Sequence, residues 1–134
     1  TSEASKALTA DANGVVTFDN GISEEFTAVT SSSGTVSVDL QAGTNFSLTL
    51  SENVTTFNFS NPASSGKVSA FVLKLIQDST ARTVAFPSSV DWPAGTAPTI
   101  STDSGAIDFF VFITHDGGTN WYGFTAGQSM ATPA

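Results

Sequence analysis

Few side chains in this 134-residue chain are suited to acid–base, nucleophilic or metal chemistry. His115 is the only histidine and there is no cysteine, so thiolate nucleophiles and thiolate metal sites are excluded. No Gly-x-Ser-x-Gly sequence is present to expose a serine nucleophile on a strand-to-helix turn. His115 precedes the turn sequence Asp-Gly-Gly-Thr at residues 116–119, where an exposed residue is expected. We therefore expect no catalytic residue and no enzymatic activity.

Three aspartates, Asp103, Asp108 and Asp116, raise the question of a glycosidase or a calcium site. Glycosidase carboxylates lie about 5–10 Å apart across a cleft. The spacing of the three aspartates along the sequence gives no sign of such a pair. The turn at 116–119 lacks the alternating oxygen ligands of a calcium-binding loop, so we expect no metal and no cofactor. Asp108 stands inside an apolar run, and it should lie at a sheet edge, in a pair or at a subunit contact. Arg82, the only arginine, is a possible partner.

Aromatic residues are the remaining candidates for a binding surface. Trp92, Trp121 and Tyr122 could form a platform on which sugar rings stack, although packing inside the fold is the alternative. The chain has 11 phenylalanines; most must lie in the core, and the rest are expected in an interface. The candidate interface or glycan contacts are Trp92, Phe110, Phe112, Trp121 and Tyr122.

The charge balance excludes two classes of partner. The formal net charge is -8, and lysine and arginine together number 4. A nucleic-acid-binding protein needs a basic surface that neutralises phosphates, and an anionic membrane attracts basic segments. We therefore expect neither nucleic acid nor membrane as a partner. No apolar run approaches the roughly 20 residues that span a bilayer as a helix.

Alternation of apolar and hydroxyl side chains predicts strands along most of the chain. The predicted strands cover residues 15–18, 36–40, 46–50, 54–59, 67–77, 82–86, 106–114 and 120–124, and residues 22–29 are a further candidate strand. Residues 67–77 and 106–114 are apolar on both faces, which predicts central strands covered on both sides; a helix remains an alternative for 67–77. The composition of residues 87–98 predicts a loop that contains Trp92. The fold class is therefore all-β, an antiparallel β-sandwich or jelly-roll-like domain with an extended N-terminal arm.

Composition divides the chain into three parts. Residues 1–33 form an N-terminal arm and connector with one short hairpin, residues 34–126 form the β-sandwich core, and residues 127–134 form a C-terminal tail. Residues 1–12 are small, polar and aperiodic, so we expect them to be an arm that orders only when it is bound.

Three stretches together resemble a structural module of tailed-phage virion proteins. They are NFSLTLSENV at 45–54, VDWPAGTAPTIST at 90–102 and GAIDFFVFITHDGGTNWYG at 105–123. Members of this family occur in tail fibres, appendages and small capsid-associated proteins, including those of cyanophages and other marine phages. The resemblance implies a place in the virion and a homotrimer, and it transfers no catalytic residue. The chain has neither shaft repeats nor coiled-coil heptads, which favours a small stand-alone protein over a fibre.

These observations lead to two hypotheses of function. The first is a capsid decoration (cement) protein, a homotrimer that binds the major capsid protein and bridges capsomers, with the arm ordering on the shell. The alternative is a tail-fibre or receptor-binding module that recognises host glycans through Trp92, Trp121 and Tyr122. A carbohydrate-active enzyme is a third class, and the missing acid–base pair argues against it.

Overall fold

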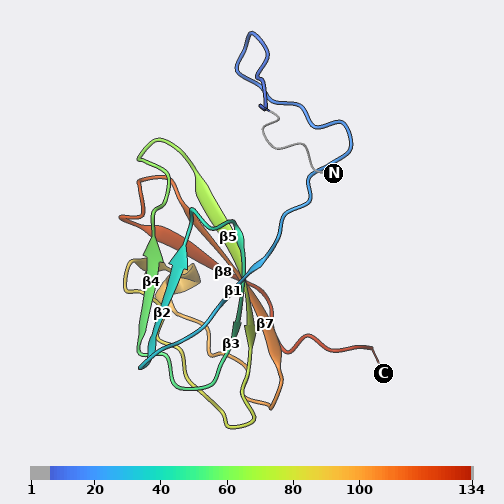
Figure 1. The fold of residues 1–134 in the computed structure, drawn as a ribbon. Helices are drawn as coiled ribbons and strands as arrows, with labels where there is room; N and C mark the ends of the chain where they lie inside the picture. The colour runs from blue at the N-terminus through green and yellow to red at the C-terminus, as the bar shows by residue number, and fades with distance from the viewer. Residues whose placement is uncertain (1–6, 134) are drawn as a thin grey trace.

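The computed structural model describes residues 7–133, which form eight strands and one short 3-10 turn. Six strands make a mixed sheet in the order β1-β3-β5-β7-β8-β6, and two make a separate ladder, β2-β4 (Figure 1). The elements are β1 (Thr27–Val29), β2 (Thr35–Asp39), β3 (Asn45–Thr49), β4 (Thr56–Ser60), β5 (Ser69–Ile76), β6 (Val90–Asp91), the turn η1 (Pro93–Gly95), β7 (Ile107–Thr114) and β8 (Trp121–Gly127). The all-β prediction is confirmed, and residues 67–77 contain a strand, not a helix. None of residues 7–133 belongs to a helix with the length and hydropathy of a membrane span.

The direction of strand pairing differs from the antiparallel prediction. Only β5–β7 and β7–β8 are antiparallel, whereas β1–β3, β3–β5, β2–β4 and β6–β8 are parallel. Alternation shows that one face of a strand is buried, but it carries no information about the direction of the neighbouring strand. From β1 to β5 the chain passes back and forth between the large sheet and the ladder. Each ladder strand thus serves as the crossover that parallel neighbours require.

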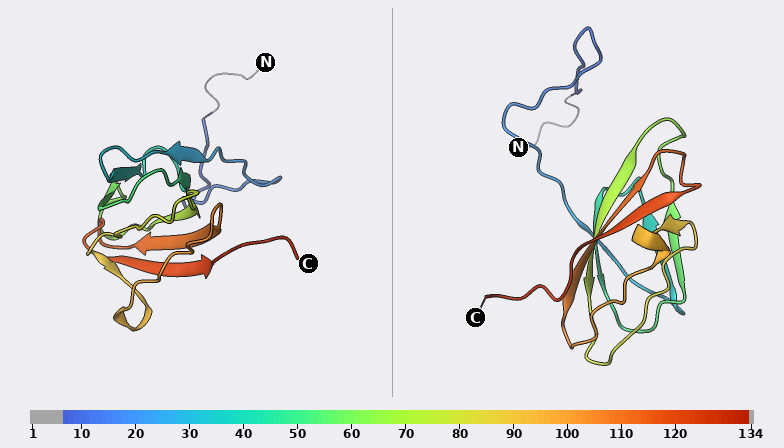
Figure 2. Two further views of the ribbon diagram at one scale, coloured as in Figure 1. Left: turned by 90° about the horizontal axis from the view of Figure 1, so that it is seen from below. Right: turned by 180° about the vertical axis from the view of Figure 1, so that it is seen from behind.

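One hydrophobic core lies between the large sheet and the ladder (Figure 2). Side chains of both contribute to it, including Val38 and Phe57 of the ladder and Phe71 and Phe112 of the sheet. The rings of Phe71 and Phe112 stack with centroids 5.0 Å apart. The segment between β5 and β7 completes the cover over this inner face with the partly buried side chains of Val84, Phe86, Trp92 and Ile100.

Two predicted strands did not form. Residues 15–18 are exposed and belong to no strand, because nothing in the described chain pairs with them. Residues 82–86 make a single parallel bridge, Val84 to Val54. Conversely, β6 lies within the predicted loop at 87–98. The candidate strand at 22–29 formed only over its last three residues, as β1, which pairs with β3.

Residues 7–26, called here the N-terminal segment, are exposed throughout and project away from the sheets (Figures 1 and 2). The carboxylate of Asp11 accepts hydrogen bonds from the backbone N–H groups of Asn13 and Val15 and so closes a turn. The segment is attached to the large sheet by Glu24, which accepts hydrogen bonds from Thr44 and from Asn45 at the start of β3. Of the predicted arm, residues 1–6 lie outside the described residues.

Candidate functional site

The turn after β7 is organised by Asp116, not by a catalytic histidine. His115 is exposed. The Asp116 carboxylate accepts hydrogen bonds from the backbone N–H of Asn120 at 2.9 Å, from the Asn120 side chain at 2.9 Å and from the Thr114 hydroxyl at 3.0 Å. These bonds, led by the one from the Asn120 backbone, hold the pKa of Asp116 below its usual value. This aspartate is therefore occupied in shaping a tight turn.

Asp108 is buried in β7 and holds the C-terminal tail and a loop against the sheet. Its carboxylate accepts hydrogen bonds from the Ser101 N–H at 2.8 Å, the Ser129 N–H at 2.9 Å and the Gln128 Nε2 at 3.2 Å. Burial acts to raise its pKa, but these bonds outweigh burial and leave the pKa below its ordinary value. The predicted sheet edge is wrong, because β7 lies between β5 and β8, and Asp108 is instead hydrogen-bonded to the loop and the tail.

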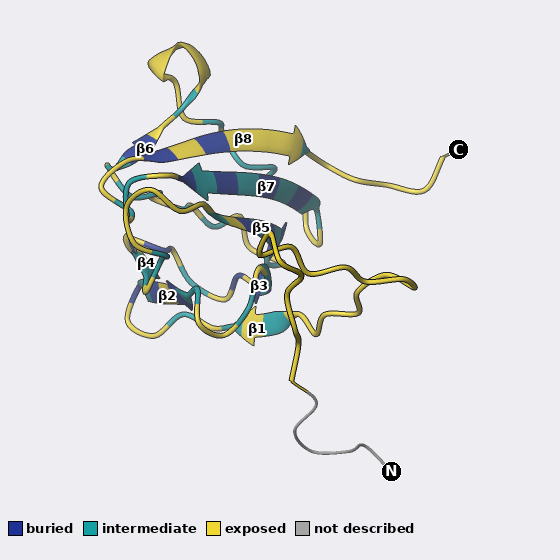
Figure 3. Cartoon of the chain, turned by 90° about the horizontal axis from the view of Figure 1, so that it is seen from above, coloured by how far each residue is buried: buried dark blue, intermediate teal, exposed yellow. Residues whose placement is uncertain are grey.

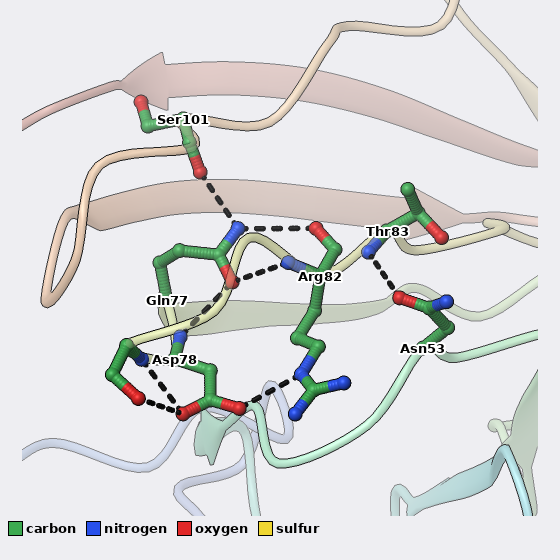
Figure 4. Close-up of polar contacts among 7 residues, drawn as sticks. Asn53, Gln77, Asp78, Arg82, Thr83 and Ser101 are labelled. Carbon is green, nitrogen blue, oxygen red and sulfur yellow. Dashed lines mark hydrogen bonds and ion pairs between the residues drawn. The ribbon is translucent and has the colours of Figure 1, made fainter.

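Arg82 is not the partner of Asp108. Its guanidinium forms an ion pair with Asp78 at 2.8 Å, four residues earlier. This pair lies beside the buried side chain of Gln77 at the end of β5 (Figure 4). The amide of Gln77 donates to the carbonyl oxygens of Arg82 and Ser101 and accepts from the N–H groups of Asp78 and Arg82. All four hydrogen-bonding positions of this amide are used to fix the turn after β5.

The carboxylates of Asp108 and Asp116 accept hydrogen bonds from separate segments of the chain, and the carboxylate of Asp78 is paired with Arg82. Within residues 7–133, no three histidine, cysteine, aspartate or glutamate side chains gather closely enough to hold a metal ion. Asp103 is exposed and lies in the turn before β7, where its carbonyl oxygen accepts a hydrogen bond from Ala106.

Three of the five candidate contact residues are buried within the chain itself. Phe110 and Phe112 are 0% exposed and Trp121 is 1% exposed. They pack in the core and cannot contact a sugar or a partner on the surface, so their assignment as contacts is corrected here. The structure separates them from Tyr122, which is 49% exposed.

Trp92 and Tyr122 do line one shallow groove, together with Asp91, Pro93, Gly123 and Phe124. The indole of Trp92 is only partly exposed, because it packs edge-on against Phe86 with centroids 5.2 Å apart and against Phe112 with centroids 5.7 Å apart. The turn that follows is tight, with Ala94 and Gly95 both at positive φ. Trp92 is thus mainly a packing residue that leaves one edge for the groove.

A further candidate surface, not predicted from the sequence, is the sheet face opposite the core. We call it the outer face and define it by Val72, Lys74, Phe109, Val111, Ile113 and Phe124. Val72 lies opposite Val111, which lies opposite Phe124 on its other side, so the apolar stripe crosses β5, β7 and β8. The first five of these residues are half-buried and Phe124 is 44% exposed.

The prediction that both faces of β5 and β7 are covered is therefore wrong for the described part of the chain. Figure 3 shows the ladder on one side of the large sheet and a residue-by-residue alternation of burial along β7. Among the described residues, no second layer of strands lies over the outer face. The apolar residues on the outer face are consequently left for contact with something other than this single chain.

Two apolar side chains from outside the sheet border the outer face. Phe26, at the end of the N-terminal segment, lines a hollow of about 220 Å³ with Val72, Lys74 and Phe109. Met130, in the C-terminal tail, lines a second hollow of about 340 Å³ with Val72, Phe109 and Val111. Both side chains are mostly exposed, so they lie at the border of the outer face and do not cover it.

Comparison with known proteins identifies no relative. No family model, no curated protein and no solved structure matches the chain significantly. Any function is therefore argued from the surface itself and from the motifs of the sequence.

Proposed function

We propose that this chain is a structural protein of a tailed-phage virion, a capsid decoration (cement) protein that forms a homotrimer on the head and bridges capsomers of the major capsid protein. The observation that carries the proposal is the outer face, an apolar surface across three strands that the single chain leaves uncovered. Such a surface is typical of a protein that works by assembly.

The core supports this role as a rigid platform. We propose that the large sheet, the ladder and the segment between β5 and β7 make up a β-sandwich or jelly-roll-like core, with an arm before it and a tail after it. A decoration protein stabilises a shell by burying surface at many symmetric contacts, so that modest individual contacts add up by avidity. This mechanism requires no reactive group. The side chains of Asp108, Asp116 and Gln77 form hydrogen bonds that stabilise turns and loops.

A second candidate function is a tail-fibre or receptor-binding module that recognises host glycans. The observation in its favour is the groove between Trp92, Tyr122 and Phe124, since aromatic rings beside a polar rim suit stacking against sugars. Trp121, which belonged to this hypothesis, is buried and takes no part.

Reconstitution on phage heads tests the proposal. Heads that lack the protein are mixed with purified wild-type protein, sedimented and heated. We expect the protein to sediment with the heads and to raise the temperature at which they release DNA. Light scattering on the isolated protein should report a trimer, or a monomer that trimerises only on the shell. A protein that leaves the heads unbound but retains a glycan in solution would support the second candidate, and a stable dimer would contradict the trimer.

A further inference from the structure

The outer face contains a cation that any partner has to accommodate. Lys74 lies opposite Phe109 on one side and opposite Ser47 on the other, and its side chain is half-buried. Among residues 7–133, Arg82 and Asp78 form the ion pair, and no carboxylate is paired with Lys74. Covering this face while Lys74 remains unpaired would bury an uncompensated charge, which is strongly unfavourable. The occupant should therefore bring a carboxylate as well as apolar side chains.

This requirement argues against two identical outer faces packed against each other. A two-fold contact centred on this face would bring the Lys74 side chains of the two copies together, and like charges in such a contact oppose association. The occupant is more simply a different part of a second copy, in a head-to-tail contact.

The N-terminal segment has the complementary properties. Val16, Phe18 and Ile22 are exposed and apolar, and Asp19 directly follows Phe18. The segment leaves the body through Gly21, which has a positive φ of 84°, and it extends away from its own sheets (Figures 1 and 2). The segment therefore holds its apolar side chains and the Asp19 carboxylate away from the sheets of its own chain.

We propose that residues 15–19 of one copy cover the outer face of the next copy, with Val16 and Phe18 against the apolar side chains of β7 and β8 and with Asp19 paired to Lys74. A head-to-tail contact of this kind closes into a ring when the rotation between copies permits. The inference rests on the proposed function to the extent that the ring is the trimer proposed there. Its test uses purified protein alone, so it succeeds or fails separately from binding to heads.

Complementation between two variants tests the contact. The segment variant Val16→Ser/Phe18→Ser keeps its outer face, and the face variant Val111→Ser/Phe124→Ser keeps its segment. Light scattering should report each as a monomer, and a mixture should give a one-to-one complex, because one intact segment meets one intact face. Leu8→Ser, which removes an exposed apolar side chain outside residues 15–19, should assemble like wild type. Circular dichroism and the fluorescence of buried Trp121 confirm that each variant is folded.

A charge exchange tests the ion pair. Lys74→Glu and Asp19→Lys should each weaken association by roughly tenfold or more, and the double variant Lys74→Glu/Asp19→Lys should recover most of the loss. A wild-type monomer at every concentration, no complex in the mixture, or no recovery in the double variant would overturn the inference. A segment variant that keeps the wild-type mass but binds heads poorly would also overturn it, since the segment would then be a clamp on the capsid. Assembly as described without any binding to heads would instead refute the proposed function and leave this contact standing.

Discussion

Trp92 packs directly against the backbone of Gly123, where an added Cβ would lie 2.8 Å from the Cζ3 atom of the indole. The same Cβ would lie 2.7 Å from a methyl group of Val90. Gly123 has no positive φ, so close approach is the reason for a glycine in the middle of β8.

Gly123→Ala should therefore push the indole out of its place over the core. We expect the free energy of unfolding to fall by about 1–3 kcal/mol, as for other overpacked sites, when it is measured by urea denaturation. Thr125→Ala, at an exposed position of the same strand, should change it by less than about 0.5 kcal/mol. Equal effects of the two substitutions would mean that the backbone there has room to move.

Trp92→Ala should lower the free energy of unfolding by about 2–4 kcal/mol, somewhat less than for a fully buried tryptophan. The cause is the loss of its edge-on contacts with Phe86 and Phe112. Tyr122→Ala removes a half-exposed ring and should have a smaller effect in the same denaturation experiment. If the wild-type protein binds a glycan and the single substitution Tyr122→Ala abolishes that binding, the result would support the receptor-binding alternative with the groove as its binding site.

Gln77→Ala should be among the most destabilising single substitutions outside the apolar core. It leaves partly buried backbone groups of Asp78, Arg82 and Ser101 without their partner, and a hydrogen bond left unmade away from solvent is costly. A loss of about 2–4 kcal/mol is expected, again from urea denaturation. The matched control Gln41→Ala is exposed and should behave like wild type; similar losses in both would show that solvent replaces the missing bonds.

Acid should loosen the C-terminal tail through Asp108. The pKa of Asp108 is below its ordinary value of 3.8 in the folded chain. Its carboxylate therefore stabilises the fold above that pH, and the contribution disappears as the pH falls through the folded pKa. Urea midpoints measured between about pH 6 and about pH 2 should fall at the acid end. Asp108→Asn should be less stable near neutral pH, and its stability should decline less steeply in acid because the Asp108 contribution is already lost. Some decline should remain, because Glu24, Asp39, Asp78 and Asp116, whose pKa values are also lowered, still titrate. A decline as steep as that of wild type would remove Asp108 from the explanation.

The sequence predicted the longer strands because their alternation reports burial of one face, and seven of the eight strands fall on predicted or candidate ranges. It could not show which face of β7 is buried, since both are apolar. Asp108 and Thr114 share the buried face with Phe110, which made that face resemble the exposed one. Their polar atoms are satisfied from the tail and from the turn, and those contacts are distant in sequence.

One signal for the outer face was present in the sequence. Lys74 alternates with Leu73 and Leu75, which marks its side of β5 as the side away from the core. To carry that inference to β7 requires the register Lys74 to Phe109, and register depends on turns and crossovers that alternation does not determine. The two-residue strand β6 could not be predicted from alternation, because it is defined by its pairing with β8.

Electron microscopy of whole virions tests the central claim, a role in the virion, most directly. Particles of a phage proposed to carry this protein are labelled with a gold-conjugated antibody raised against the purified protein. The proposed decoration role predicts gold distributed over the head and absent from heads of a phage that lacks the protein. Gold confined to the tail would support the receptor-binding alternative instead. Intact particles without any label, from preparations in which the free protein is recognised, would contradict a role in the virion altogether.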